Sequence, residues 1–536
     1  MTAGNGPMSI AVQGAASASL IWSCAVFLVQ SIGITQLYRH HSSPRPKPVS
    51  PALGDGETPH ITIIRPVKGL EPCLYECLAS TFQLVYPKSK LTIYLCVAST
   101  KDPAYPLLRK LVADFSGFDV KVLVEEDDPV LHGTDGHVNN LGPNPKIRNM
   151  SRAYREAKGD LIWIVDCNVW LGAGSAGRMV DKLCGFGPDG ARMTPYKFVH
   201  QLPLVVDVGT PGVGEEQSLL PRDTSLPAQA PRNLLDYGGR IEEMFMSTSH
   251  AKFYSAINTV GVAPCVVGKS NMFRKSHLDF MTDPSRNPIL SASDAGRGRG
   301  IDFFSSYICE DHLIGDLIWR STVPDTDTSA TYRNHGLVFG EVAIQPTSGM
   351  SVAAYVARRV RWLRVRKWTV LLATLVEPGI EPFLCSLHLS FALTTLPWVH
   401  EWFGVPQTWV AMAAIWASTV VAWMALDRWF SSMLHTLQSV EVDANTPSFA
   451  LGSARRGGIP RRPFREWFIA WLGREMLALP IWTWAVLLGT TVNWRGKQFK
   501  VRMDMSVVEV ESQIRPSSVP SGDTSRPDSR NKDRID

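Results

Sequence analysis

The chain carries two adjacent carboxylates, Glu310 and Asp311, inside an otherwise apolar stretch. Leucine and isoleucine residues recur behind them at helical spacing as far as position 318, which is typical of an amphipathic helix packed on a core. Burial without a positive partner raises the pKa of a carboxyl group, and a raised pKa suits a general base near neutral pH. The alternative is structural, because acidic residues in a first helical turn stabilise the helix dipole. Taken alone, the pair favours the structural alternative.

Two other aspartates follow predicted strands. Asp102 comes shortly after the apolar run 91–97, and Asp166 directly ends the run 161–165. A carboxylate at the end of a strand is well placed to bind a metal ion. An Asp before Pro also starts turns, and an Asp at the end of an element also caps helices and turns, so both structural alternatives stay open.

A third group, Arg358, Arg361 and Trp362, forms an R-x-x-R-W motif. Transfer of a sugar from a nucleotide donor requires a nucleotide site, charge neutralisation at the diphosphate and a base for the attacking hydroxyl. Carboxylates that hold a divalent cation and an arginine clamp supply the second requirement. On sequence alone, the motif could equally be a lipid-facing anchor.

The elements that position these residues alternate between strands and helices from residue 60 to about residue 340. This alternation predicts an α/β domain with a mostly parallel sheet, in which ligands bind beyond the carboxyl ends of the strands. The predicted strands are 61–65, 91–97, 120–124 and 161–165, and the predicted helices are 74–83, 104–114 and 146–158.

Composition places this domain at a membrane. The 536 residues are 45% hydrophobic and 19% charged, with 17 tryptophans, a mixture too apolar for an ordinary soluble enzyme and too polar for an all-membrane protein. The net charge is +5, and many basic residues adjoin apolar runs, which favours anionic lipid over nucleic acid as a partner. The 9 cysteines form no CxxC pair or metal signature, which indicates a reducing compartment.

The apolar run 15–38 is long enough to span a bilayer and reads as an uncleaved anchor after the short segment 1–14. Basic residues follow it at once in a Pro- and Ser-rich linker, 39–59. The positive-inside rule therefore predicts that the domain 60–346 faces the cytosol.

The C-terminal third changes character. Residues 347–368 predict a basic amphipathic helix at the membrane surface, and 369–494 contain the apolar runs 369–399, 408–426 and 476–492. The basic segments around these runs all predict a cytosolic position, so at least one run must be interfacial rather than spanning. A basic juxtamembrane segment, 495–511, and a disordered tail, 512–536, end the chain.

Two stretches interrupt the α/β pattern, 207–231 and 283–300, and both predict surface loops. The second precedes the acidic pair and could serve as a mobile lid or be a passive insertion.

The ordered motifs resemble those of the inverting membrane glycosyltransferases, and in detail the ceramide glucosyltransferase family. The resemblance covers the chain from the N-terminal anchor to about residue 502. It is carried by R-P-V-K-G-L-E-P from residue 65, D-P-A at 102–104, N-P-K-I-R-N at 144–149, D-L-I-W-I-V-D at 160–166, V-H-Q-L-P at 199–203, T-S-H at 248–250, V-V-G-K-S-N-M-F-R-K at 266–275, the acidic pair, R-R-V-R-W at 358–362 and a C-terminal W-F-I-A-W-L-G-R-E.

The resemblance implies a GT-A-like domain that transfers glucose from UDP-glucose to the primary hydroxyl of ceramide with inversion, at the Golgi membrane or the endoplasmic reticulum. It implies that Asp311 is the catalytic base and that Asp102 belongs to the uridine site. Lys146 could contact phosphate or cap a helix.

By the same resemblance, Arg358, Arg361 and Trp362 close the diphosphate site. His200 and His250 fall in family motifs. Each either contacts the acceptor or supports the site, or is a structural histidine. Glu310 is a further candidate for site support.

The resemblance also implies a divalent cation, Mg²⁺ or Mn²⁺, at Asp166. Here the motif reads Asp166-Cys167-Asn168 and lacks the second Asp of an ordinary D-x-D. Asn168 supplies a neutral oxygen, so a weaker cation site is expected.

Two other functions compete with this one. A processive polysaccharide synthase or a transferase for another lipid would share the aspartates and R-x-x-R-W, although the few apolar runs argue against a polymer channel. An inactive membrane scaffold is the third possibility, and the intact site residues speak against it.

Overall fold

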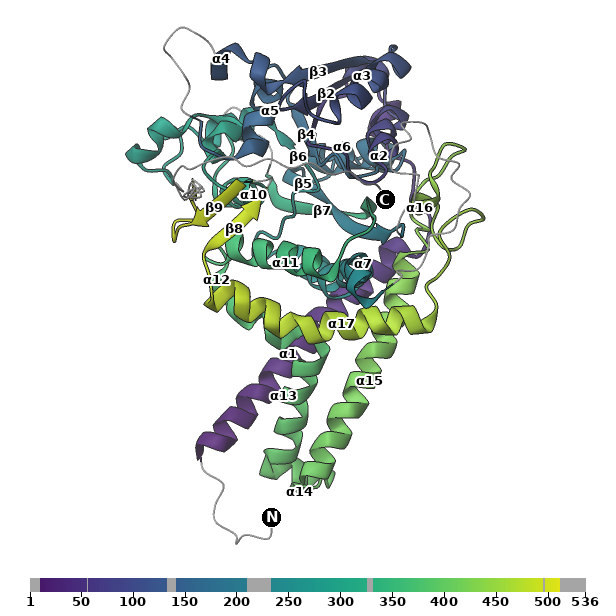
Figure 1. The fold of residues 1–536 in the computed structure, drawn as a ribbon, viewed down its shortest axis with the longest axis vertical. Coiled ribbons are helices and arrows are strands. Elements are labelled where there is room, and N and C mark those ends of the chain that lie inside the picture. Colours follow the sequence, from purple (N-terminus) through teal and green to yellow (C-terminus); the bar gives the residue numbers. More distant parts are fainter. Residues whose placement is uncertain are drawn as a thin grey trace, which may run out of the picture.

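The computed structural model describes residues 10–54, 56–132, 141–209, 233–324, 331–494 and 497–510. Most of the predicted loop 207–231 and the whole predicted tail 512–536 lie outside these residues. The structure has an α/β domain above a group of apolar helices (Figure 1).

A seven-stranded sheet forms the centre of the α/β domain, in the order β3-β2-β1-β4-β6-β5-β7. Strands β1 to β4 pair in parallel, β6 runs antiparallel to both β4 and β5, and β5 pairs in parallel with β7. The predicted mostly parallel fold class is confirmed. The strands are β1 Ile61–Pro66, β2 Leu91–Val97, β3 Asp119–Val124, β4 Leu161–Val165, β5 Tyr196–Asp207, β6 Ser270–Arg274 and β7 Arg333–Thr347.

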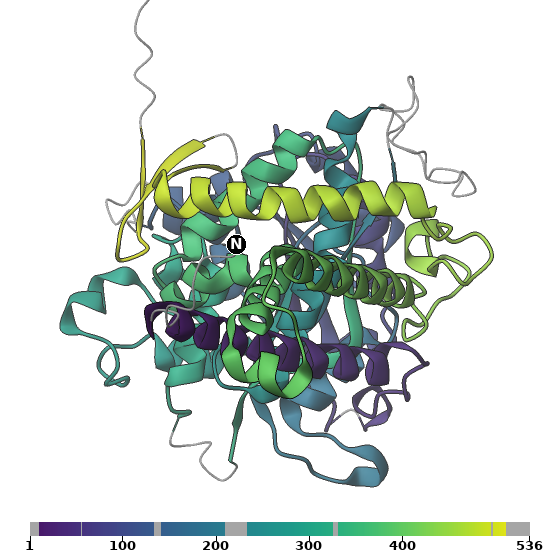
Figure 2. The ribbon, with the colours of Figure 1, turned by 90° about the horizontal axis from the view of Figure 1, so that it is seen from below.

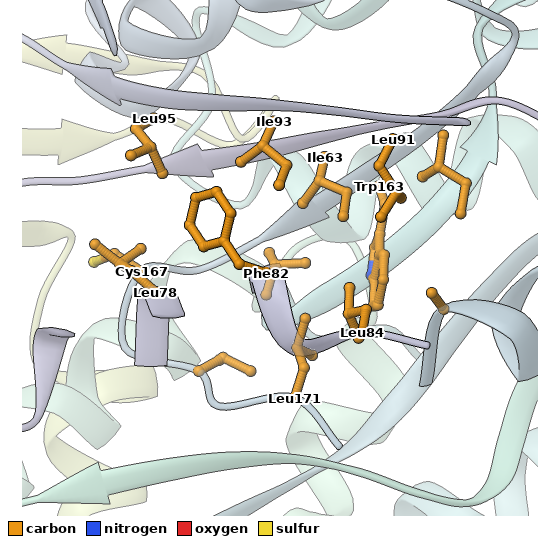
Figure 3. Close-up of a cluster of buried hydrophobic side chains, with 14 of the residues drawn as sticks. Ile63, Leu78, Phe82, Leu84, Leu91, Ile93, Leu95, Trp163, Cys167 and Leu171 are labelled. Atoms are coloured by element: carbon orange, nitrogen blue, oxygen red, sulfur yellow. The ribbon is translucent and has the colours of Figure 1, made fainter. Parts of the chain in front are cut away.

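Helices cover both faces of the sheet. Because β1, β2 and β4 are buried along their whole length, their apolar side chains alternate between two cores. In one core Trp163 and Ile93 pack against Phe82 (Figure 3). The helices on this face are α2 Leu74–Ala79, α3 Tyr105–Asp114 and α6 Ser175–Cys184, and those in the opposite core are α5 Pro145–Arg155, α9 Lys275–Met281 and α10 Glu310–Arg320.

The helices α1 (Ile10–His41), α13 (Pro382–Thr395) and α15 (Trp409–Leu434) pack side by side below the α/β domain (Figures 1 and 2). By length and composition α1 and α15 are candidate membrane spans. A third candidate is α13 with α14 (Pro397–Phe403), a pair bent by 76°. The apolar run predicted at 369–399 is therefore broken into several helices, as its Glu-Pro interruptions suggest.

The predicted apolar run 476–492 is not among these candidate spans. Helix α17 (Phe464–Trp482) enters it from a charged first half and lies across the upper ends of the apolar helices (Figures 1 and 2). It ends at Trp482, where a π-helical turn, Thr483–Leu487, leads to strand β8 (Thr491–Trp494). The run is therefore divided between the end of α17, the π-helical turn and β8, and its position relative to the membrane stays a prediction.

The remaining elements connect these layers. Helix α11 (Val352–Arg366) carries the R-x-x-R-W motif and packs on α7 (Gly238–Phe245) and α17. A π-helical turn, Met246–His250, joins α7 to α8 (Ala251–Val260). The other elements are α4 Pro129–His132, α12 Leu371–Val376, α16 Ser448–Leu451, β9 Lys497–Val501 and β10 Val507–Glu509.

Candidate active site

The structure brings together five charged side chains at the carboxyl ends of the central strands. The cluster consists of Lys146, Asp166, Lys269, Glu310 and Asp311, and we call it the carboxylate-lysine cluster. Two cations face three carboxylates, so the fully ionised cluster has one negative charge in excess.

Each member of the cluster is positioned by its own element. Asp166 ends β4, and its backbone N–H donates to the carbonyl of Lys269 at 3.0 Å. Lys146 lies in the first turn of α5, where Asn144 caps the helix by accepting from the Lys146 N–H at 2.8 Å. Glu310 and Asp311 begin α10, which confirms that they lie at the start of a buried helix.

Lys146 links the two ends of the cluster. Its Nζ lies 3.0 Å from Asp166 Oδ1 and 3.0 Å from Glu310 Oε1. Burial alone would lower the pKa of Lys146, but Asp166 and Glu310 outweigh it and raise that pKa. Lys146 therefore stays protonated; Asn144 rather than Lys146 caps α5, and a contact of Lys146 with phosphate stays a prediction.

Asp166 is held from both sides. Lys269 Nζ lies 3.0 Å from Asp166 Oδ2, opposite the Lys146 contact. Burial would raise the pKa of Asp166, but the two ammonium groups outweigh this effect and lower it, so the carboxylate stays ionised. Lys269 also donates to Asn168 Oδ1 at 3.4 Å.

Glu310 and Asp311 differ in their partners. Glu310 is bound by Lys146 and accepts from Asn144 Nδ2 at 3.2 Å. Asp311 forms no ion pair within 4.0 Å in the described part of the chain, and the backbone N–H groups of Asp311 and His312 are its hydrogen-bond donors. Burial raises the pKa of Asp311, with Lys146 opposing the rise. Asp311 is half-buried, and a partly accessible carboxylate with a raised pKa and no cation of its own has the properties of a general base.

A pocket of about 310 Å³, part of it open to solvent, adjoins the acidic pair. Its polar lining comes from Lys146, Glu310, Asp311 and Asn271, whose buried Oδ1 has no hydrogen-bond partner among the described residues. Gly268 borders the same cavity, and a Cβ on it would lie 2.8 Å from Asp311 Oδ2. A glycine is therefore required for the present position of the Asp311 carboxylate.

The other predicted site residues lie outside these contacts. Asp102 accepts from the N–H of Gly69 at 2.9 Å and of Ala104 at 2.9 Å, so its carboxylate joins two loops at the same edge of the sheet. Arg358 pairs with buried Glu242 at 2.9 Å and stacks over Trp362. Trp362 packs in the apolar cluster between β5, α7 and α17, and Arg361 is one turn along α11 from Arg358.

The two predicted histidines meet at one tyrosine. His200 is fully buried, and its ring nitrogens face Tyr254 Oη at 2.6 Å and Asn258 Oδ1 at 3.2 Å. His250 stacks on the other side of Tyr254, with ring centroids 5.2 Å apart. Burial lowers the pKa of both histidines, so they are neutral near pH 7 and have the surroundings of structural residues.

Sequence reasoning did not single out Asn144, Gly268, Lys269 or Asn271. All four lie inside motifs quoted above, and Asn144-Pro145 has the form of a helix start, with a capping Asn and Pro at the first helical position. Lys269 had no comparable local signal, because its pairing with Asp166 joins residues 103 positions apart.

The residues around Asp166 supply only part of the ligand set that a divalent cation needs. Among the described residues no group of three or more His, Cys, Asp or Glu side chains gathers as a cation site. Both Asp166 oxygens already contact lysines, and Asn168 is the neighbouring neutral donor. Mg²⁺ is commonly held by one or two carboxylates together with substrate phosphates, so Asp166 and Asn168 fit a cation that arrives with the donor.

The fold and this site define a membrane-attached glycosyltransferase with a GT-A-like α/β domain. The model of the family described as Glycosyl transferase family 21 matches residues 23–198 and 295–507. The chain belongs to this family.

Two curated relatives match over nearly the full length. The chain is 58% identical to a ceramide glucosyltransferase from Pyricularia oryzae, covering 94% of this chain and 96% of that one. It is 49% identical to a ceramide glucosyltransferase from Gibberella zeae, covering 97% and 98%. Among solved structures, the mannosyltransferase PcManGT from Pyrobaculum calidifontis, in complex with GDP-Man and Mn²⁺, is 15% identical with a TM-score of 0.37, covering 80% of this chain and 96% of that one.

Proposed function

We propose that this protein transfers glucose from UDP-glucose to the primary hydroxyl of ceramide with inversion, giving β-glucosylceramide. The acceptor class is supported by the two relatives named ceramide glucosyltransferase, which match at 58% and 49% identity over nearly the whole chain. The observation that carries the chemistry is Asp311, a half-buried carboxylate with a raised pKa, without an ion pair in the described part of the chain, beside a cavity.

Asp311 acts as the base in a single displacement. The ceramide oxygen attacks C1 of glucose while the bond from C1 to the phosphate oxygen breaks, and the hydroxyl proton passes to the Asp311 carboxylate. UDP leaves with the electron pair of the broken bond, and attack from the opposite face inverts the configuration at C1. A base with a raised pKa accepts this proton more readily than an ordinary carboxylate does.

The two lysines act on the leaving group. Lys146 and Lys269 already lie at Asp166, and their ammonium groups can turn to the diphosphate oxygens as negative charge develops there. We assign Asp102 to the uridine part of the site, and Arg358, Arg361 and Trp362 to its closure over the diphosphate. For Arg358, this assignment requires that its guanidinium either break its ion pair with Glu242 or contact Glu242 and the diphosphate at the same time.

Asp166 and Asn168 would hold a divalent cation, Mg²⁺ or Mn²⁺, together with the donor phosphates. Such a cation supplies further neutralisation of the diphosphate charge. Glu310 acts indirectly, since it fixes Lys146 between the two carboxylates. His200 and His250 support the site by packing around Tyr254.

We propose that the α/β domain faces the cytosol from a Golgi or endoplasmic-reticulum membrane. Basic residues occupy the last turn of α1 and the segment after it, and the basic loop after α15 lies on the same side of the apolar helices as the α/β domain (Figure 1). The positive-inside rule assigns that side to the cytosol. A water-soluble donor then meets a lipid acceptor at the membrane surface.

A transfer assay with two matched acceptors tests this function. Full-length protein in detergent receives labelled UDP-glucose with either ceramide or 1-deoxyceramide, which lacks only the primary hydroxyl. We expect a single-sugar β-linked product from ceramide and none from 1-deoxyceramide. A polymer, a glucosylated sterol or equal labelling of both acceptors would overturn the acceptor assignment, and no transfer to any lipid would favour the inactive scaffold.

A further inference from the structure

A second cavity, largely apolar in its lining but with several charged side chains, lies far along the chain from the active-site residues, where α15 and α17 meet the loop between them. Its volume is about 540 Å³, part of it open to solvent. Its charged lining consists of Arg428 from α15, Arg461 and Arg462 from the loop, and Glu243 from α7. Ser432 and Ser453 add hydroxyl groups. We call this space the arginine cavity.

The charges of the arginine cavity do not balance. Glu243 is matched by Arg462, whose Nε and Nη2 lie 3.0 and 2.8 Å from its oxygens. Neither Arg428 nor Arg461 forms an ion pair within 4.0 Å in the described part of the chain. Both side chains line the same cavity. This leaves two uncompensated positive charges on one cavity wall.

Arg428 also holds an unused donor. Its Nη2 donates to the carbonyl of Arg462 at 2.9 Å, and its guanidinium lies 5.2 Å from the ring centre of Trp467. These contacts fix the side chain, but its Nη1 is buried without a hydrogen-bond partner among the described residues. A buried donor without a partner is costly, so a fixed and unused guanidinium N–H indicates a missing acceptor.

The depth of Arg428 along α15 indicates where that acceptor comes from. Residues 409–426 of this candidate span contain no charged side chain, and Asp427 and Arg428 follow directly. Eighteen helical residues extend about 27 Å, close to the thickness of the hydrocarbon core. Exposed Trp429 and Phe464 flank this level, as aromatic side chains do at a membrane interface. If residues 409–426 cross the bilayer, Arg428 lies at the level of the lipid headgroups.

We propose that the arginine cavity binds the phosphate of an anionic membrane lipid, with Arg428 and Arg461 as its two cationic ligands. Guanidinium groups bind phosphate through paired N–H donors, and the Ser453 hydroxyl can donate to a remaining oxygen, whereas the Ser432 hydroxyl already donates to the carbonyl of Arg428 at 2.7 Å. The site would tie the end of α15 to the start of α17 when the lipid is bound.

Lipid binding to full-length protein tests this inference. The protein in a neutral detergent is titrated with dioleoyl phosphatidic acid or dioleoyl phosphatidylcholine, and bound lipid is counted by native mass spectrometry. We expect wild type to bind phosphatidic acid and to bind it more tightly than phosphatidylcholine. Arg461→Gln should weaken binding about fivefold, the effect of one basic side chain on an anionic lipid. Arg428→Gln should weaken it at least as much.

The matched control is Arg456→Gln, which removes an exposed positive charge from the same loop but outside the cavity lining. It should bind phosphatidic acid like wild type. Equal loss in the Arg456 and Arg461 variants would indicate diffuse surface attraction and overturn the site. If the Arg428 variant misfolds, the Arg461 variant still tests the site, because the Arg461 side chain is exposed and its substitution should leave the fold intact.

A titration with inorganic phosphate shows whether the cavity binds a membrane lipid or a soluble phosphate compound. At the same concentrations inorganic phosphate should neither raise the melting temperature nor displace the bound phosphatidic acid. If phosphate instead stabilised wild type and not Arg461→Gln, while the lipid did not bind, the occupant would be a soluble phosphate and the membrane-lipid proposal would be wrong.

Discussion

Two clusters of ionisable side chains in this molecule have the same number of charges and different surroundings, one partly accessible and the other buried. The carboxylate-lysine cluster has two lysines and three carboxylates at the edge of the sheet. A second cluster, at the junction of the α/β domain with the apolar helices, has Lys252 and Arg474 facing three carboxylates, Asp427, Glu475 and Glu381. We call it the junction cluster. Each has one acidic group more than it has cations.

In both clusters a carboxyl group has a raised pKa. At the junction, burial raises the pKa of Glu475 to about 7. Glu475 is nevertheless fully engaged, since one oxygen accepts from Arg474 and the other from the backbone N–H of Phe383 at 3.1 Å. Asp311 receives backbone N–H groups alone and borders a cavity. A raised pKa is therefore insufficient to identify a base, and access to a reacting atom is the second condition.

The largest effect is expected when the junction cluster loses its central carboxylate. Asp427 accepts from Lys252 Nζ at 2.7 Å and from Arg474 and Trp471 at 3.0 Å each. Asp427→Asn leaves buried cations unmatched and should lower the free energy of unfolding by about 3–5 kcal/mol, read as a lower melting temperature in detergent.

A surface variant, Glu156→Gln, serves as the control for Asp427→Asn. Exposed Glu156 pairs with Arg152 in an i,i+4 contact at 2.7 Å, so its loss should cost less than about 0.5 kcal/mol. The folded fraction of Asp427→Asn should transfer glucose at the wild-type rate. A large fall in activity per folded molecule would show that the junction cluster takes part in chemistry and would break the comparison.

The next largest effect concerns the lysine that links the carboxylates of the site. Lys146→Met should reduce kcat about 100-fold, because it removes a cation placed for the leaving group. It should also raise the pKa of Asp311, which Lys146 holds down, and move the acidic limb of the pH–rate profile to higher pH. Rates from pH 5 to 9 measure both effects.

Lys269→Met is the matched variant for this prediction. Lys269 pairs with Asp166 but not with Glu310 or Asp311 within 4.0 Å among the described residues. It should lower the rate with little movement of the acidic limb. Identical profiles for the two variants would contradict the assigned link between Lys146 and Asp311.

A smaller effect is expected from crowding the base. Gly268→Ala places a methyl group 2.8 Å from Asp311 Oδ2 and must displace that carboxylate. We expect kcat to fall about tenfold with little change in KM for UDP-glucose, since misplacing a reacting group raises the barrier. Gly117→Ala, where a Cβ would meet open space, should leave both constants unchanged. An unchanged kcat in Gly268→Ala would argue against Asp311.

The last effect is on the pH dependence of stability and leaves the transfer rate unchanged. The pKa of Glu475 is raised to about 7 in the folded protein, so folding favours its protonated form. The stability from this group is complete below its unfolded pKa of about 4.3 and is lost as pH rises to about 7. Glu475→Gln should therefore show a smaller fall in melting temperature between pH 4.5 and 7 than wild type, with kcat unchanged. Equal falls would mean that Glu475 is ionised throughout.

Local sequence patterns were sufficient to predict the strands and the start of α10. The runs 61–65, 91–97 and 161–165 are apolar and β-branched, and they form β1, β2 and β4. Glu310 and Asp311 precede a helical apolar repeat and begin α10. These features depend on neighbouring residues, which is why periodicity predicted them.

Features that depend on distant contacts were not predicted. Lys269 meets Asp166 across the β4–β6 pairing, and Lys146 meets Glu310 across 164 positions of sequence. The run 476–492 has the hydropathy of a short span, yet its first residues continue α17, which is fixed across the apolar helices by buried Trp467 and Trp471. The orientation of α17 depends on tertiary packing, and a hydropathy pattern carries no information about such packing.

The most direct test of the account is the transfer rate of Asp311→Asn beside wild type, with UDP-glucose binding measured on the same samples. The substitution removes the proton acceptor and keeps the shape of the side chain. We predict that transfer to ceramide falls at least about 100-fold while the donor dissociation constant changes little. Transfer within a few-fold of wild type would contradict the assignment of Asp311 as the base and the distinction drawn between the two clusters.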